Sequence, residues 1–99
     1  RPRDYVKGPM PASVGALLRT AYRQFPSVFE GVARRPDRYN AGRRFLFELE
    51  ERGQAYVFAP DNLWINNTES RRERLEATYR AGLVQAVREM PAIKAFLGL

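Results

Sequence analysis

The sequence predicts an α/β fragment that is mostly α, with about four helices and one or two short strands. Apolar residues recur at helical spacing in several stretches that prolines and glycines separate. One run, "QAYVFA" at 54–59, is instead aromatic and β-branched, has no helical period, and lies between Gly53 and Pro60. Such a run is typical of a buried strand in an α/β layer, and we expect most of that layer to lie outside these 99 residues.

The first two helices are expected on either side of Pro26. Residues 13–25 carry apolar side chains at helical spacing, with Ser13 as the N-cap and Pro26 as the stop. Ser27 and Glu30 have the spacing of a capping box, in which each of the two side chains accepts a backbone N–H of the other residue. A second helix should therefore begin at Ser27.

A third helix is expected from Asp37, as its cap, through Arg52. Gly53 should stop it, because glycine adopts a left-handed backbone without Cβ strain. Phe47 lies off the apolar stripe, about 100° from its neighbour Leu46. The stripe of this helix consists of Tyr39, Gly42, Phe45, Leu46 and Leu49.

The longest helix should open with a second capping box, Ser70 and Glu73, and run for about 20 residues. Pro91 is expected to break it, because proline has no N–H to donate and its ring clashes with the preceding turn. The last residues, "AIKAFLGL", then predict a short final helical turn. The stripe of the long helix consists of Leu75, Tyr79, Gly82, Leu83, Ala86, Val87 and Met90.

The strand at 54–59 needs partners that the chain does not supply. A second extended piece is expected in "RPRDYV" at the N-terminus, but two short strands do not form a stable sheet in water. We therefore expect 54–59 to extend the sheet of a larger domain, beside the chain that enters at Arg1 to Asp4. Its unpaired edge could also join two copies into a homodimer.

Composition excludes several classes of chemistry. The chain has no cysteine and no histidine, which excludes a disulfide framework, a thiol nucleophile and any triad with an imidazole base. We expect no metal site, no cofactor and no catalytic residue here. No apolar run is long enough to span a membrane, and no secretory signal is visible. Without an initiator Met, the chain reads as an excised piece of a longer protein.

Charge leaves two interpretations open. The chain carries 17 basic and 11 acidic residues, for a net charge of +6, and nearly all the bases are arginines. A basic surface of this kind can bind nucleic acid, but glutamates alternate with the arginines, which favours a solvated mixed-charge surface. Because cations are disfavoured in a first helical turn, Arg71 and Arg72 should have an acidic partner, in this chain or elsewhere. The two clusters are Arg34, Arg35, Arg38, Arg43 and Arg44, and Arg71, Arg72 and Arg74.

Two short motifs have simpler explanations. Pro11 to Gly15 is half of a nucleophile elbow, but the first glycine, the preceding strand and the base are absent, so Ser13 is favoured as a helix cap. Residues 66–68, Asn-Asn-Thr, match a glycosylation sequon, and loop and capping roles are favoured for them.

Three apolar residues fall at unexpected places. Trp64 and Ile65 lie in a predicted loop, and Phe47 lies on a polar helix face. Together they indicate either a docking surface for another domain or a cover for the fragment's own core.

An ordered set of phrases resembles a known family. The phrases are "RPRDY", "AYRQFP", "RRPDRYN", "LFELEERGQAYVFAP" and "LEATYRAGLVQA". Their order and spacing resemble the C-terminal region of bacterial patatin-like phospholipases, over nearly all of the chain. The matching positions are Arg3 to Tyr5, Tyr39 and Asn40, Leu49 to Gly53, Pro60, and Leu75 to Gly82.

The resemblance implies a role without chemistry of its own. Patatin-like proteins are α/β acyl hydrolases with a Ser–Asp dyad in Gly-x-Ser-x-Gly and Asp-Gly turns, and neither motif occurs here. Residues 1–99 would be a single C-terminal segment that packs on the catalytic sheet and helps to shape the acyl pocket. Its partners would be the N-terminal catalytic domain of the same parent and, through it, a lipid or ester substrate. A cytoplasmic, membrane-peripheral location is expected. The alternative is a stand-alone basic helical module that binds nucleic acid or a protein.

Overall fold

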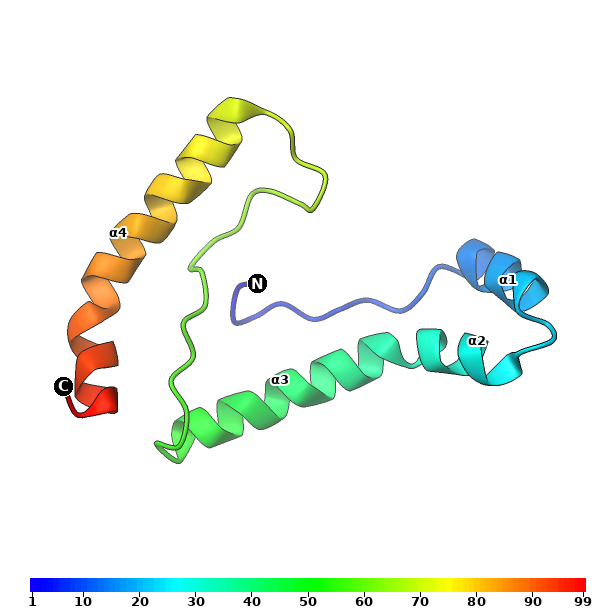
Figure 1. Cartoon of the computed structure of the whole chain (residues 1–99), viewed down its shortest axis with the longest axis horizontal. Helices are drawn as coiled ribbons and strands as arrows, with labels where there is room; N and C mark the ends of the chain where they lie inside the picture. The colour runs from blue at the N-terminus through cyan, green and yellow to red at the C-terminus, as the bar shows by residue number, and fades with distance from the viewer. The chain divides into compact units, whose positions relative to one another are not determined.

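The computed structural model describes all residues, 1–99, as four α-helices joined by extended segments and turns (Figure 1). No strand or sheet is present. The expected α/β class is therefore wrong, and the fold is all-helical. The helices are α1 (Ala12–Ala21), α2 (Pro26–Ala33), α3 (Arg35–Glu51) and α4 (Arg72–Leu97).

The segment 54–59 is extended but forms no ladder with any other segment. A short apolar run between Gly53 and Pro60 has the composition of a strand, yet a strand exists only where a second backbone offers its N–H and C=O groups. The expected neighbour is present only through a side chain: the guanidinium of Arg3 donates to the carbonyl oxygen of Val57, at 3.0 Å. The strand prediction is wrong because it relied on local composition, which does not show whether a second backbone segment is present to pair with.

The chain divides into two units, which are described separately. Unit 1 consists of Arg1–Tyr5 and Tyr56–Leu99, and unit 2 of Val6–Ala55. Unit 1 contains α4 and the extended segment that precedes it, whereas unit 2 contains α1, α2 and α3, of which α2 packs on both of the others.

Prolines rather than capping serines lie at the starts of the helices of unit 2. Neither α1 nor α2 has a side-chain cap, and Ser13 and Ser27 lie inside their first turns, so both capping predictions are wrong. Pro26 is the first residue of α2, where its missing N–H costs nothing because the first N–H groups of a helix have no intrahelical acceptor. Pro36 plays the same part in α3 and is buried.

For α3, the predicted start of the helix is wrong and the predicted end is confirmed. The helix begins at Arg35, so Asp37 is not its cap but lies in the first turn, where a carboxylate is favoured by the helix dipole. Gly53 stops the helix as predicted, with φ of +72°. Its N–H donates to the carbonyl of Glu50, and the N–H of Gln54 donates to that of Leu49, both at 2.9 Å. These two bonds form a Schellman motif.

Helix α4 continues where a break was expected. It begins at Arg72, with Glu73 in its first turn and Ser70 outside, and passes through Pro91 to Leu97. The proline removes one backbone bond, but a contact beyond it holds the last turn: the ring of Phe96 lies 6.1 Å from that of Tyr56.

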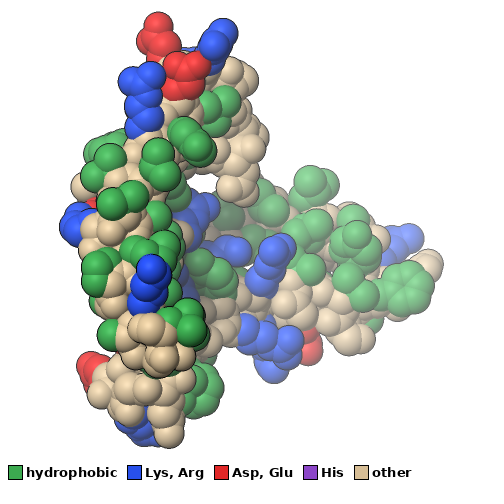
Figure 2. Space-filling view, turned by 60° about the vertical axis from the view of Figure 1, so that its left-hand side comes forward, with side chains coloured by type: hydrophobic (Ala, Val, Ile, Leu, Met, Phe, Trp, Pro, Cys, Tyr) green, Lys and Arg blue, Asp and Glu red, His purple; other side chains and the backbone are tan.

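The apolar stripes of α3 and α4 form as periodicity predicts, but they face solvent. Apart from Pro36, no aliphatic or aromatic side chain is buried in either unit. On α3, Phe45 is 58% exposed, and on α4, Tyr79 and Leu83 are 72% and 53% exposed. Figure 2 accordingly shows apolar side chains at the surface of the helical parts. The buried side of α4 is instead marked by Gln85, which is 6% exposed.

Candidate functional site

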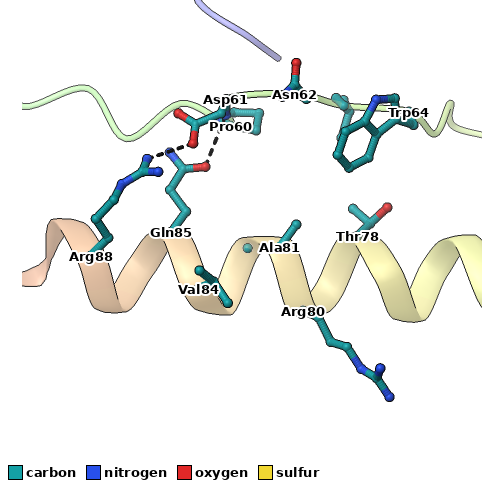
Figure 3. Close-up of a pocket in the computed structure, with 12 residues that line it drawn as sticks. Pro60, Asp61, Asn62, Trp64, Thr78, Arg80, Ala81, Val84, Gln85 and Arg88 are labelled. Atoms are coloured by element: carbon teal, nitrogen blue, oxygen red, sulfur yellow. Dashed lines mark hydrogen bonds and ion pairs between the residues drawn. The ribbon is translucent and has the colours of Figure 1, made fainter.

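A groove lies in unit 1 between α4 and the extended segment 60–64 (Figure 3). Its volume is about 420 Å³, and we call it the α4 groove. It has a polar end around Gln85 and an apolar end under the indole of Trp64. Among the residues that line it are Pro60, Asp61, Trp64, Ala81, Gln85 and Arg88.

The polar end is held together by the side-chain amide of Gln85. Its oxygen accepts the N–H of Asp61 at 3.1 Å, and its nitrogen donates to the carbonyl oxygen of Ala59. The same nitrogen lies 3.3 Å from a carboxylate oxygen of Glu89, whose other oxygen accepts the hydroxyl of Tyr56 at 3.4 Å. Gln85 therefore fixes the backbone of the segment against the helix, and we call this arrangement an amide clamp.

An ion pair closes the same end. The guanidinium of Arg88 donates to the carboxylate of Asp61 at 2.7 Å. That hydrogen bond raises the pKa of Arg88 above its usual value. Both charged groups at this end of the groove are therefore paired with each other.

The apolar end is open. Trp64 is 63% exposed, and its indole lies over the side of α4 that carries Thr78 and Ala81, whereas Arg80 points away (Figure 3). A Cβ placed on Gly82 would meet nothing within 4 Å, so this part of the groove is not filled. The geometry suits a flat or linear apolar group, bound between an aromatic ring and a helix.

The three apolar residues at unexpected places, Trp64, Ile65 and Phe47, have different surroundings in the structure. Trp64 borders the α4 groove, and Ile65 beside it is half-buried. Phe47 is half-buried in unit 2, where the guanidinium of Arg43 lies 5.3 Å from its ring centre. Of the three, only Trp64 presents a largely exposed apolar surface.

The arginines at the start of α4 have the carboxylate partners that the sequence predicted. Arg71 and Arg74 pair with Glu69, at 2.9 and 3.5 Å, and Arg72 pairs with Glu76 at 2.8 Å. The side-chain bond from Arg71, with help from its backbone N–H, lowers the pKa of Glu69 to about 2. This cluster is thus satisfied inside unit 1.

The sequon forms a local turn. The side-chain oxygen of Asn66 accepts the backbone N–H of Thr68 at 3.0 Å and its hydroxyl at 2.9 Å. This is the loop role that the sequence favoured for residues 66–68.

The arginines of unit 2 are arranged differently. Arg34, Arg35 and Arg38 are exposed and form no ion pair, and we call them the arginine surface. Arg35 and Arg38 border an open hollow of about 580 Å³ whose other side is formed by Val28 and Val32 of α2. Arg43, by contrast, lies about 140° around α3 from Arg38. The predicted cluster is therefore not one continuous face.

A second amide clamp holds unit 2 together. The side-chain oxygen of Asn40 accepts the N–H of Lys7 at 2.8 Å, and its nitrogen donates to the carbonyl of Lys7 at 2.9 Å. The ammonium of Lys7 lies 5.3 Å from the ring centre of Tyr39. Sequence reasoning noticed Tyr39 and Asn40 only as part of a resemblance and missed Gln85. The available signal was an amide on the helix face away from the apolar stripe.

Two further features are absent from residues 1–99. No group of three or more histidine, cysteine, aspartate or glutamate side chains could hold a metal ion. None of the four helices has the length and apolar character needed to cross a membrane.

Comparison with known proteins gives a family but no function. No curated protein and no solved structure matches the chain. A family model, described as a domain of unknown function and named DUF6363, matches residues 25–98, which include α2, α3 and α4. The chain therefore belongs to the DUF6363 family.

Proposed function

We propose that this chain is the non-catalytic C-terminal part of a patatin-like serine lipid acyl hydrolase. It docks on the catalytic domain of the same parent and contributes the α4 groove as one side of the acyl pocket. The chain supplies no Ser–Asp dyad, so the chemistry belongs to the parent. We further propose a cytoplasmic location with peripheral membrane contact, in line with the cysteine-free, basic composition.

One observation carries the docking part of this proposal. Neither unit buries a large apolar side chain, although hydrophobic burial is the main favourable term in folding. Phe45 and Leu46 of the α3 stripe are 58% and 41% exposed. The arginine surface lies at the N-terminal end of the same helix. Covering this stripe with a partner would supply the missing burial. The catalytic domain of the same parent protein would be a partner that is always present.

Residues in the motifs that resemble the patatin-like family have structural roles in this chain, which supports that part of the proposal. Arg3 donates to the segment at Val57, Asn40 forms the clamp on Lys7, and Gly53 ends α3 with a left-handed backbone. Each position therefore has a structural reason to recur in a related C-terminal region. The earlier idea that 54–59 extends the catalytic sheet is not retained, because no strand exists there.

The first test is the coding sequence before Arg1. A Gly-x-Ser-x-Gly elbow followed by an Asp-Gly turn is expected, and a different upstream domain would refute the proposal. The isolated chain should not hydrolyse a nitrophenyl ester, and turnover by it would also count against the assignment.

The second test uses the full-length parent. Trp64→Ala should change the ratio of kcat/KM between long-chain and short-chain nitrophenyl esters by about tenfold, because the lost ring contacts only longer acyl chains. Val87→Ala is the matched control, since this side chain is 68% exposed, does not line the groove, and should leave the ratio unchanged. If the ratio is the same in both variants, the α4 groove is not part of the acyl pocket.

The arginine surface favours a second candidate, a basic binding module. Three exposed arginines without ion pairs would suit an anionic partner, either nucleic acid or an acidic protein surface. Binding of labelled DNA that weakens steeply between low and physiological salt, and that is lost in the triple variant Arg34→Ala, Arg35→Ala, Arg38→Ala, would support it. If no salt-dependent binding is observed, the basic binding module is refuted and docking on the catalytic domain remains the proposed function.

A further inference from the structure

A set of apolar residues on α4, which includes part of the apolar stripe and continues beyond Pro91, has the spacing of a coiled-coil seam. Its members follow one another at steps of four, three, four, three and four residues along the helix. This alternation is the repeat with which two helices pack side chains into each other's gaps. We call these residues the α4 seam: Tyr79, Leu83, Ala86, Met90, Ile93 and Leu97.

Unit 1 leaves most of this seam uncovered, although Ala86 and Ile93 are half-buried within the unit. Tyr79 and Leu97, near its two ends, are 72% and 61% exposed, and Leu83 between them is 53% exposed. The extended segment of the unit packs on a different face, because Gln85 lies about 160° around the helix from Leu83. Ile93 and Ala86, about 80° and 100° around the helix from Gln85, form the edge of the seam nearest the clamp, so the clamp and the seam use adjoining faces of α4.

Two charges on the edge of the seam indicate what covers it. Glu73 and Lys94 are 21 residues apart, which is three heptads, so they lie on the same flank near opposite ends of α4. Both are exposed, and neither forms an ion pair within the chain. Opposite charges at the two ends of one stripe match when the same helix is laid against itself in the reverse direction.

We propose that the α4 seam binds a second copy of this chain, as an antiparallel pair of α4 helices related by a twofold axis. Leu83 then packs against Ala86 of the other copy, and Tyr79 against Met90 of the other copy. In this register Glu73 meets Lys94 of the other copy on both sides of the axis. The interface is self-complementary, as a twofold dimer requires.

Other features of α4 are compatible with this pairing. The small side chain of Ala86 opposite Leu83 allows close approach of the two helices at the centre. Pro91 follows Met90 by one residue, about 100° around the helix, so its ring stays outside the seam. The pairing of copies through 54–59 that the sequence suggested required a strand, whereas this one uses an existing helix. It also leaves the α3 stripe, proposed above for the catalytic domain, unoccupied.

Sedimentation equilibrium of the 99-residue chain tests the dimer. The expected mass is 22.8 kDa, twice the 11.4 kDa of one chain. Leu83→Ser should give 11.4 kDa at the same concentration with an unchanged helical circular dichroism spectrum. Val84→Ser is the matched control: this neighbour is 67% exposed, lies outside the seam, and should leave the dimer intact. A native chain that stays monomeric at high concentration would overturn the proposal.

Charge reversal tests the antiparallel register independently of the apolar residues. Glu73→Lys and Lys94→Glu should each weaken dimerisation about tenfold, because two attractive pairs become two repulsive ones. The double variant restores opposite charges and should recover the native dissociation constant. Both positions are exposed, but each reversal also opposes the helix dipole, so the helical circular dichroism of every variant is recorded as the control for folding. A double variant as weak as either single one would refute this register, and single variants without effect would do so too.

Discussion

Asn40 in unit 2 and Gln85 in unit 1 bind an extended segment in the same way. Each side-chain amide accepts one backbone N–H and donates to one backbone carbonyl, from a helix whose apolar stripe faces elsewhere. Their surroundings differ. Gln85 is buried and is joined by Glu89 and by the Arg88–Asp61 ion pair, whereas Asn40 is half-buried.

The two units also use their arginines differently. In unit 1, Arg71, Arg72, Arg74 and Arg88 pair with carboxylates of the same unit. In unit 2, the arginine surface has no such partners. Unit 1 thus pairs these four arginines internally and leaves apolar surface for contact. Unit 2 offers both apolar surface and charge, which makes it the better candidate for binding an acidic or mixed surface.

Breaking the clamp of unit 1 should have the largest effect. Gln85→Leu keeps the volume but leaves the N–H of Asp61 and the carbonyl of Ala59 without partners, which should cost about 2–3 kcal/mol of unfolding free energy. Urea unfolding followed by circular dichroism measures it. Thr78→Val is the control, because that hydroxyl bonds only within α4, to the carbonyl of Arg74. Equal stabilities of the two variants would contradict a structural role for the clamp.

The clamp of unit 2 should be weaker, because water can replace part of it. We expect Asn40→Leu to cost about 1–2 kcal/mol and to abolish hydrogen-exchange protection of the Lys7 amide. The Gln85→Leu variant should leave that amide protected. If instead Asn40→Leu proved the more destabilising of the two, burial would not be what distinguishes the clamps.

The smallest effect is expected from Glu69, which is tied to Arg71 and Arg74 at the surface of unit 1. Its folded-state pKa of about 2 lies below the ordinary value of 4.5, so its contribution to stability is complete above pH 4.5. That contribution is lost as the pH falls through about 2. Unfolding midpoints measured across this range should fall less steeply in Glu69→Gln than in the native chain. Parallel curves would show that the pair contributes nothing.

Periodicity predicted the helices, and Gly53 correctly marked the end of α3, because both signals are local. The strand at 54–59 failed for the opposite reason, since a strand depends on a partner that composition cannot reveal. The capping prediction for Ser27 failed because Pro26 is the first residue of α2, and α4 passes through Pro91 with a ring contact between Phe96 and Tyr56 beyond it.

The candidate site was predictable only in part. Trp64 was noticed because an aromatic residue in a loop is unusual, and it borders the α4 groove. Gln85 was not noticed, because its role depends on the backbone of Ala59 and Asp61, more than 20 residues away in the sequence. An isolated amide on a helix carries no sign of which distant segment it will bind.

Because each amide binds the extended segment only through backbone atoms of that segment, the clamps place little demand on the segment's side chains. At position 61 the clamp itself excludes only proline, which lacks the N–H that Gln85 accepts. Sequence can therefore drift along the segment while its course over α4 stays fixed. The lining of the α4 groove is free to change from one DUF6363 protein to another, and ligand preference could diversify without any change in how the helix and segment are joined.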